Sequence, residues 1–518
     1  MTQVSVPDDL NVIRRARADT RMAAELAGIL GDFQRQQISY CYWKSSRRLP
    51  AVLAGDGDID LLIARHDQHR ARAILLQRNF KIFPSVADRE HPAVLSALGY
   101  DAANGLLIHL HLHFCLVLGE PLLKNYHIPW AHLLQARAVT HPTLPIRILD
   151  PAAEAVVLVV RACLELRRLD PVMFRSWRAK TQEFSLDRAD LAARVDRTEF
   201  RDLVAELLGA DLVEPATVAL YGTEPPERQA QLRRRVRRYF APCRSYNAVE
   251  ARARSAGRAV LWIAGYLNRD FLQGPRPWNR RAPGGGCIVA IMGVDGSGKS
   301  TSVRTMRSWL GSKIDVIPIY FGTGDGRPSW PLRPLKMAMP VVARIFGRRT
   351  RQGAPGKPRA APHGKTLGDA PGWLYSALLM VWAAAVALDK RIKLTAAHRG
   401  ANRGLVVLTD RYPQNQIVGF NDGPLLNRLN SVPGWLRRFE HNVYALADRL
   451  RPTLVIKLVV TPETAARREP GMDPAIIRER IGALQRLEFP GVRVVCVNAE
   501  QPLAEMIRTI KHEIWRLI

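Results

Sequence analysis

The sequence contains little cysteine: there are six in a chain of 518 residues, and no two of them form a Cys-x-x-Cys pair. They are Cys41, Cys115, Cys163, Cys243, Cys287 and Cys496. Such wide spacing argues against a zinc ribbon and against a disulfide framework, because both need cysteines in a recognisable paired pattern. The N-terminal residues also lack the apolar stretch of a signal peptide. We therefore expect a protein of a reducing compartment, located in the cytoplasm.

Long hydrophobic runs are also lacking. The longest covers residues 372–388 and is followed at once by Asp389, Lys390 and Arg391. It is shorter than the roughly 20 apolar residues that a membrane-spanning helix needs. We favour a buried helix for this segment and keep a membrane-associated helix as the less favoured alternative.

Acidic residues are in deficit. Lys and Arg total 76 against 47 Asp and Glu, which gives a formal net charge of +29 and a pI of about 10.6. This excess favours polyanionic partners such as nucleoside phosphates, nucleic acid or an anionic membrane surface. The alternative is a compositional bias, because the arginines are scattered along the chain. The arginine cluster in 229–240 has no aromatic stacking pattern, so no clear nucleic-acid motif is present.

The composition is that of a globular protein, with 47% hydrophobic and 24% charged residues, and the length suggests roughly three domains. Residues 1–150 mix helices and strands, and residues 151–279 are predicted to be mainly helical. A linker rich in Pro, Gly and Arg covers 273–286. Strands and helices alternate over 287–518, interrupted by a basic Gly/Pro insertion at 347–368, whose role stays open. The expected fold class is α/β.

The sharpest motif lies in Gly293–Ser300, which fits the pattern G-x-x-x-x-G-K-[ST] in full. An apolar strand precedes it and a helical pattern follows, the context that gives the motif its weight. The backbone N–H groups of such a loop bind phosphate oxygens at the positive end of the helix. The nucleotide-binding residues predicted here are Gly293, Gly296, Ser297, Gly298, Lys299, Ser300 and Thr301. Lys299 is expected to reach the β- and γ-phosphates of ATP, and Ser300 to coordinate Mg²⁺.

The loop resembles that of the thymidylate kinase-like nucleotide kinases, where an acid commonly precedes the Gly-x-Gly-Lys stretch, as Asp295 does here. A second match is Asp410-Arg411-Tyr412 at the end of an apolar strand, similar to the Asp-Arg-Tyr/Phe motif of that family. The resemblance implies that Asp410 helps to hold Mg²⁺ and that Arg411 binds the phosphate of the acceptor. The alternative for an Asp-Arg pair at a strand end is a surface ion pair.

A third match is a strand over 454–461 followed by Pro-Glu-x-Ala-x-x-Arg, which resembles the segment leading into the lid of these kinases. The resemblance implies that lid arginines stabilise the charge of the transferring phosphoryl group. Arg467 and Arg468 are favoured for this role over Arg478 and Arg480. The alternative is that all four lie on the exposed faces of basic helices.

The sequence also departs from the thymidylate kinase pattern. Residues 314–326 lack the Arg-Glu-Pro-type segment that reads the base, and the Ala-Tyr-Gln stretch expected after Asp410-Arg411-Tyr412 is missing. The resemblance therefore covers about 287–518 for fold and phosphate chemistry and leaves the acceptor open.

The N-terminal region resembles the nucleotidyltransferase superfamily, with Lys44-Ser45-Ser46 before the strand that contains Asp58 and Asp60. Alternate residues of a strand share a face, so these two carboxylates can hold a divalent metal together. Lys44 stands where the family has glycine. Where the family has a third carboxylate, the matching strand carries three histidines, His109, His111 and His113. Imidazoles suit zinc better than Mg²⁺. A degenerate transferase, an active one with an unusual metal shell, and packed structural histidines are all compatible with this pattern.

The sequence thus predicts a kinase that moves the γ-phosphoryl of ATP, with Mg²⁺, to a nucleoside monophosphate or another phosphorylated small molecule. The predicted catalytic residues are Lys299, Asp295, Asp410, Arg411, Arg467 and Arg468, and the predicted metal ligands are Ser300, Asp410, Asp58 and Asp60. Two alternatives are an ATP-binding scaffold without catalysis and a nucleotidyltransferase regulated by the C-terminal region. The oligomeric state stays open.

Overall fold

The computed structural model describes residues 22–120, 123–166, 176–223, 229–322, 373–417, 420, 424–426, 432–470 and 472–518. It is of the predicted α/β class. The chain divides into two compact units, Met1–Asn268 with Trp278–Arg280, and Arg269–Pro277 with Arg281–Ile518. The division into three regions stays a prediction, and the basic insertion at 347–368 lies outside the described residues.

The N-terminal unit is built on a mixed sheet, in which seven described strands have the order β3-β4-β5-β2-β1-β9-β8. Their bounds are β1 Tyr40–Tyr42, β2 Ile59–Ile63, β3 Lys81–Ile82, β4 Val94–Asp101, β5 Leu106–His113, β8 Ala138–Thr140 and β9 Arg147–Leu149. A separate antiparallel pair joins β6 Leu116–Leu118 to β7 Tyr126–Ile128. The strand predicted to contain Asp58 and Asp60 is present as β2, which begins one residue after Asp58, and the matching strand with the three histidines is β5.

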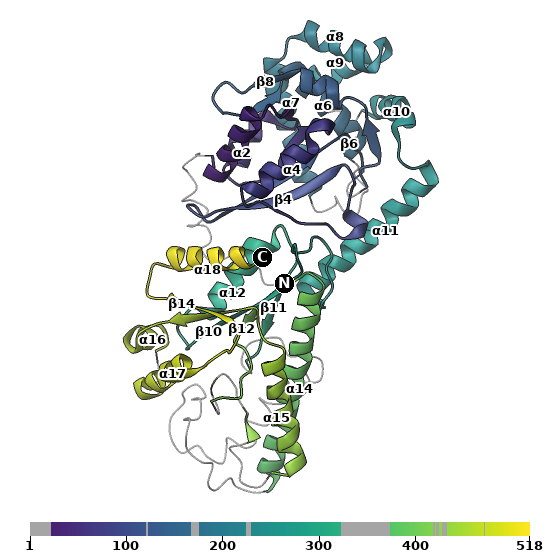
Figure 1. Cartoon of the computed structure of the whole chain (residues 1–518). Helices are drawn as coiled ribbons and strands as arrows, with labels where there is room; N and C mark the ends of the chain where they lie inside the picture. The colour runs from purple at the N-terminus through teal and green to yellow at the C-terminus, as the bar shows by residue number, and fades with distance from the viewer. Residues whose placement is uncertain are drawn as a thin grey trace. The chain divides into compact units, whose positions relative to one another are not determined.

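Two hydrophobic cores cover the two faces of this sheet. On one face α2 (Ala24–Arg35) and α4 (Gln68–Gln77) pack against the odd-numbered residues of β2, such as Leu61. The opposite face, which carries Leu62, packs against the helical layer. That layer contains α6 (Pro151–Glu165), α7 (Trp177–Arg194), α8 (Arg197–Leu208), α9 (Val213–Tyr221) and α10 (Ala230–Tyr239), and α11 (Ala248–Leu267) follows it (Figure 1). Short helices α3 (Leu49–Leu53) and α5 (Ala131–Ala136) complete the unit.

The helix α6 is the centre of the helical layer. Asp150 caps it by accepting a hydrogen bond from the N–H of Ala153, and Pro151 occupies its first turn, where a missing N–H costs nothing. Most of its side chains are buried, as expected of a helix that is apolar on every side. Helices of residues 151–279 therefore share a core with the N-terminal strands.

The C-terminal unit contains a sheet of five described strands, all parallel, in the order β11-β12-β10-β13-β14. The strands are β10 Cys287–Gly293, β11 Val316–Tyr320, β12 Val406–Asp410, β13 Leu454–Val459 and β14 Arg493–Asn498. Every residue of the central strand β10 is buried. This agrees with its continuous apolar sequence, which is typical of a parallel strand covered on both faces.

Helices cover both faces of the parallel sheet (Figure 1). The helices are α12 Lys299–Gly311, α14 Trp373–Asn402, α15 Gly434–Arg449, α16 Pro462–Arg468, α17 Pro474–Arg486 and α18 Leu503–Leu517. Residues 373–388 of the apolar run lie within α14, where Ala383, Val386 and Ala387 are buried. Among the described helices, none combines the length and the apolar character that crossing a membrane requires.

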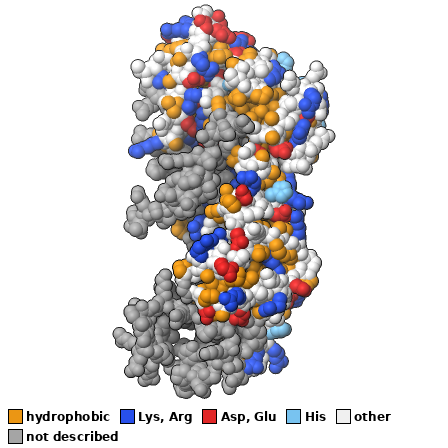
Figure 2. Space-filling model, turned by 90° about the vertical axis from the view of Figure 1, so that its left-hand side faces the viewer, with side chains coloured by type: hydrophobic (Ala, Val, Ile, Leu, Met, Phe, Trp, Pro, Cys, Tyr) orange, Lys and Arg blue, Asp and Glu red, His pale blue; other side chains and the backbone are white. Residues whose placement is uncertain are grey.

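The basic side chains do not gather in one place on the face drawn in Figure 2. On the face drawn in Figure 2, Lys and Arg lie among acidic and hydrophobic side chains and form no continuous stripe. In α10, Arg233 and Arg237 donate to the carbonyl oxygens of Leu166 and Cys163, so part of the predicted arginine cluster has a packing role.

Candidate functional site

The glycine-rich loop Gly293–Ser300 connects the end of β10 to the start of α12. Gly296 and Gly298 adopt φ values of +80° and +90°, in the left-handed region that other residues rarely enter. A Cβ atom on Gly296 would also lie 3.0 Å from the carbonyl oxygen of Ala465. Glycine is therefore required here both by the backbone conformation and by the lack of space.

Lys299 is the first residue of α12, and its side chain is buried. Its Nζ donates a hydrogen bond of 2.6 Å to the carbonyl oxygen of Val294 and lies 3.5 Å from Oδ1 of Asp295. Burial lowers the pKa of Lys299, and the charge of Asp295 acts in the opposite direction. The ammonium group is thus held inside the loop, beside the backbone that the motif assigns to phosphate.

Ser300 and Asp410 meet beside the loop. The Ser300 hydroxyl donates to Oδ2 of Asp410 at 2.6 Å. Asp410 ends β12, where it lies opposite Ile291 of the neighbouring strand β10. Its second oxygen, Oδ1, is buried and accepts no hydrogen bond from any described residue. The Ser300 hydroxyl and the Asp410 carboxylate, both hard oxygen donors, therefore lie together at the carboxyl edge of the sheet, and Oδ1 of Asp410 is available to a further partner.

Asp295 gathers basic side chains around the loop. Arg411 Nη2 donates to its Oδ1 at 3.0 Å, and Arg480 forms an ion pair with its Oδ2. Burial alone would raise the pKa of Asp295, but the charges of Lys299, Arg411 and Arg480 outweigh it and lower the pKa. Arg411 also has a φ of +69°, a strained backbone conformation for a non-glycine residue.

The four lid arginines lie in different surroundings. Arg467, Arg468 and Arg478 are exposed, and Arg468 donates to the carbonyl oxygens of Ala499 at 3.0 Å and of Gly296 in the loop at 3.5 Å. Arg480, which the sequence ranks below Arg467 and Arg468, is the one that reaches Asp295. Helical periodicity could have indicated this, because Ile477, three residues before Arg480 on α17, is buried. Residues three apart lie on the same side of a helix, so Arg480 is on the side that faces the protein. Thr301 is exposed on α12.

The strand order explains why these groups converge. The chain leaves β10 toward β11 on one side of the sheet and leaves β13 toward β14 on the other. Ligands of open α/β sheets bind at such a point, outside the carboxyl ends of the strands. The loop after β10 and the helix α16 after β13 lie at this point of the sheet edge, with Asp410 at the end of the adjacent β12.

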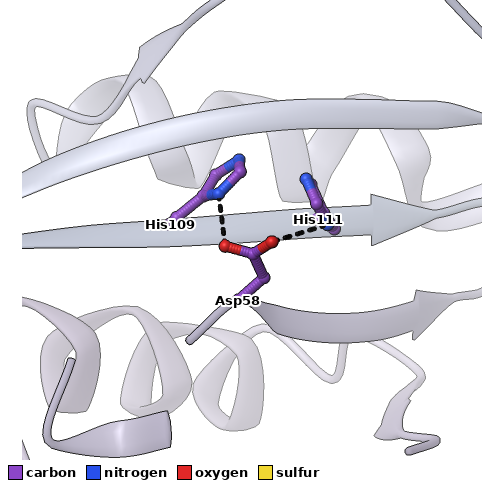
Figure 3. A group of neighbouring side chains, drawn as sticks. All are labelled: Asp58, His109 and His111. Carbon is purple, nitrogen blue, oxygen red and sulfur yellow. Dashed lines mark hydrogen bonds and ion pairs between the residues drawn. The ribbon is translucent and has the colours of Figure 1, made fainter. Parts of the chain in front are cut away.

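A second cluster of polar groups lies on the sheet of the N-terminal unit. Strands β2 and β5 are parallel neighbours, and Asp60 lies opposite His111. Asp58, just before β2, accepts a hydrogen bond of 2.7 Å from Nδ1 of His109, and its Oδ2 lies 4.0 Å from Nδ1 of His111 (Figure 3). The carboxylates of Asp58 and Asp60 and the histidines of β5 therefore lie together on one face of the sheet.

Asp60 is engaged by a lysine. Its Oδ2 lies 2.7 Å from Lys44 Nζ, and its Oδ1 lies 3.1 Å from Nε2 of His113 and 3.4 Å from Nδ1 of His111. Burial alone would raise the pKa of Asp60, but the Lys44 charge and the two histidines lower it well below its usual range. Burial lowers the pKa of Lys124 to about 8, and Lys44 adds to this effect.

These residues do not fit the magnesium pair that the nucleotidyltransferase resemblance implies. The lysine that replaces the family's glycine occupies one carboxylate, and imidazole nitrogens replace the third. Mg²⁺ requires near-octahedral oxygen coordination. Sequence reasoning also missed Arg280, in the predicted linker, whose Nη2 donates to Nε2 of His111 at 3.2 Å.

The geometry defines an α/β unit with a glycine-rich, lysine-containing loop at the carboxyl edge of a parallel sheet. No protein-family model matches the chain. Over 228 residues it is 30% identical to a protein of Escherichia coli (strain K12) named uncharacterized ATP-binding protein YghS, covering 43% of this chain and 89% of that relative. It is 27% identical over 228 residues to uncharacterized ATP-binding protein YghR of the same strain, covering 42% of this chain and 83% of the relative. The chain belongs to the family of YghS.

Proposed function

We propose that this protein is an ATP-dependent phosphotransferase of the thymidylate kinase-like type. It moves the γ-phosphoryl group of ATP to the phosphate of a nucleoside monophosphate (dTMP-like) or of a related phosphorylated molecule. Two relatives carry the name ATP-binding protein, which supports the donor. The proposal of a phosphate acceptor is based on the basic side chains around Asp295.

The donor site consists of the loop Gly293–Ser300 and Lys299. The N–H groups at the start of α12 and the ammonium of Lys299 bind the phosphate oxygens of ATP. Among the residues that the structure describes, Lys299 is held by the Val294 carbonyl and by Asp295, and it can exchange these contacts for a β- or γ-phosphate. Electrostatic attraction favours this exchange, because a polyphosphate carries more negative charge than one carboxylate.

The oxygens of Ser300 and Asp410 fit a magnesium ion. Both are hard donors, and Oδ1 of Asp410 is buried without a hydrogen bond from any described residue. Bound Mg²⁺ neutralises charge on the β- and γ-phosphates. Before binding, the Ser300 hydroxyl keeps the Asp410 carboxylate oriented toward the loop.

One observation carries the proposal: Arg411 and Arg480 come from elements far apart in the chain and meet on the single carboxylate of Asp295. Two guanidinium groups beside a triphosphate loop form a second anion site, suited to an acceptor phosphate. An oxygen of that phosphate attacks the γ-phosphorus, the bond to the β,γ-bridging oxygen breaks, and ADP leaves with that electron pair. Arg480 stabilises the charge on the transferring group.

The test is product formation from γ-labelled ATP over a panel of nucleoside monophosphates and sugar phosphates. We expect label transfer to one acceptor class, its loss in Lys299→Ala, and its retention in Arg304→Ala, which removes a positive charge from an exposed position of the same helix. Tight ATP binding without transfer to any acceptor would support the scaffold instead. Activity from α-labelled ATP that is lost only in Asp58→Ala would support a nucleotidyltransferase.

A further inference from the structure

We infer that Asp58, His109 and His111 form a binding site for a transition-metal dication of the Zn²⁺ class. The site lies in the N-terminal unit and is independent of the phosphotransferase proposed above. It is assembled on two adjacent parallel strands, with Asp58 next to the start of β2 and both histidines on β5 (Figure 3).

The ligand atoms lie at separations that a single ion can bridge. Bonds of about 2.0–2.2 Å from zinc to nitrogen or oxygen allow two ligand atoms to lie up to about 4 Å apart. Nδ1 of His109 and Nδ1 of His111 lie 2.7 and 4.0 Å from the two oxygens of Asp58, and all ligand atoms of the group are within 4.8 Å of one another. An ion between them needs only small side-chain movements.

The donor set selects the class of metal. Two imidazoles and one carboxylate are typical ligands of zinc and of neighbouring transition metals, whereas Mg²⁺ prefers oxygen ligands. The Asp58 side chain is 37% exposed. Three protein ligands with a solvent-facing side leave a coordination position for water or a substrate oxygen, as in catalytic zinc sites.

A neighbouring serine can orient His109 as a metal ligand. Ser96 Oγ lies 2.7 Å from Nε2 of His109. When Nδ1 binds a metal, the ring proton moves to Nε2, and the serine hydroxyl can accept it as a hydrogen bond, which orients the ligand. The hydrogen bond between Ser96 and His109 can therefore persist when the metal binds, because a hydroxyl group can both donate and accept.

The neighbouring group of Asp60, His111 and His113 is the less suitable one. Lys44 Nζ lies 2.7 Å from Asp60 Oδ2, so a dication there would be placed next to an ammonium group. Electrostatic repulsion therefore favours Asp58 as the carboxylate ligand.

Arg280 opposes metal binding at His111. Its guanidinium donates to Nε2 of His111, and a guanidinium has no acceptor. Metal binding at Nδ1 puts the ring proton on Nε2, where it would face this donor. Arg280 must therefore move away when the ion binds, and its removal should strengthen binding.

The experiment is a Co²⁺ titration of the chelator-treated full chain, followed by visible absorption, with Zn²⁺ and Mg²⁺ as competitors. We expect one Co²⁺ per chain, displaced by Zn²⁺ and not by millimolar Mg²⁺. Asp58→Asn and His111→Gln should each weaken binding at least tenfold, and Arg280→Met should strengthen it several-fold. His69→Gln, which removes an exposed histidine from α4, should change nothing. Circular dichroism checks that each variant is folded.

Three results would overturn the inference. One is folded wild-type protein that binds no Co²⁺. Another is binding that persists in His111→Gln, which places the ion elsewhere. The third is a loss in His113→Gln together with retention in Asp58→Asn, which assigns the ion to Asp60.

Discussion

The Ser300 hydroxyl donates a 2.6 Å hydrogen bond to Asp410, a residue 110 positions later in the chain. This contact joins the first turn of α12 to the end of β12. Because one partner comes from the glycine-rich loop and the other from the strand next to β10, the pair reports whether the two motifs act as one site.

Ser300→Ala and Asp410→Asn are each expected to weaken binding of ATP with Mg²⁺ about tenfold or more, because each removes an oxygen that fits the ion. Binding of ATP without the metal should change much less. Isothermal titration calorimetry with and without chelator measures both. Combining the two substitutions should cost less than the sum of the single effects, by about 1 kcal/mol, as for residues in direct contact. Ser312→Ala, which removes an exposed hydroxyl at the end of α12, is the control. Additive effects of the pair would contradict a shared site.

Arg480→Ala is expected to lower the rate of phosphoryl transfer about 100-fold, because a positioned donor to the transferring group is lost. ATP affinity should change less than threefold, since Lys299 and the loop amides are intact. Arg486→Ala, an exposed arginine on the same helix α17, is the control. Steady-state kinetics with the acceptor found in the panel separates kcat from KM. A change in ATP affinity alone would show that Arg480 serves the donor instead.

Gly296→Ala is expected to destabilise the C-terminal unit by about 1–2 kcal/mol, the cost of a left-handed conformation for a residue with a Cβ. The added carbon also meets the Ala465 carbonyl oxygen at 3.0 Å, so the loop must shift and ATP affinity should fall. Gly311→Ala is the matched control, because its Cβ meets nothing within 4 Å and it lies at the end of α12. Urea unfolding and ATP titration measure the two effects, and equal stability losses in both variants would refute the explanation.

Glu154→Gln should change how the stability of the N-terminal unit depends on pH. Burial raises the pKa of Glu154 from 4.5 to about 7, opposed by the hydrogen bond from the Ser46 N–H at 2.8 Å. The folded state therefore holds a proton that the unfolded chain releases near pH 4.5. The contribution of this carboxyl group to stability is full below that pH and declines until about pH 7, by about 3 kcal/mol.

Urea unfolding of the wild type and Glu154→Gln at pH 5 and pH 8 measures this contribution. The wild type should lose more stability over this interval than the variant, and Glu206→Gln, at an exposed position of α8, should behave like the wild type. Parallel pH dependences of wild type and Glu154→Gln would show that Glu154 is ionised in the folded protein.

Local sequence patterns predicted the elements that carry the site. The apolar run before Gly293 predicted β10, the motif predicted the strand, loop and helix order, and two-residue alternation predicted that Asp58 and Asp60 share one face of their strand. These features follow from neighbours in the chain, because strand periodicity and turn glycines act over a few residues.

The partners of these residues did not follow from the sequence. The resemblance to the lid segment ranked Arg467 and Arg468 above Arg480, yet Arg480 contacts Asp295. The Pro, Gly and Arg composition placed Arg280 in a linker, although Arg280 contacts His111. Both contacts join residues more than 160 positions apart. Such pairs form only when the sheets and helices pack, and the local pattern around an arginine says nothing about which distant carboxylate or imidazole the fold brings to it. The local sequence therefore determined which charged and metal-binding side chains are present on each element, and the packing of the elements determined which of these side chains contact one another.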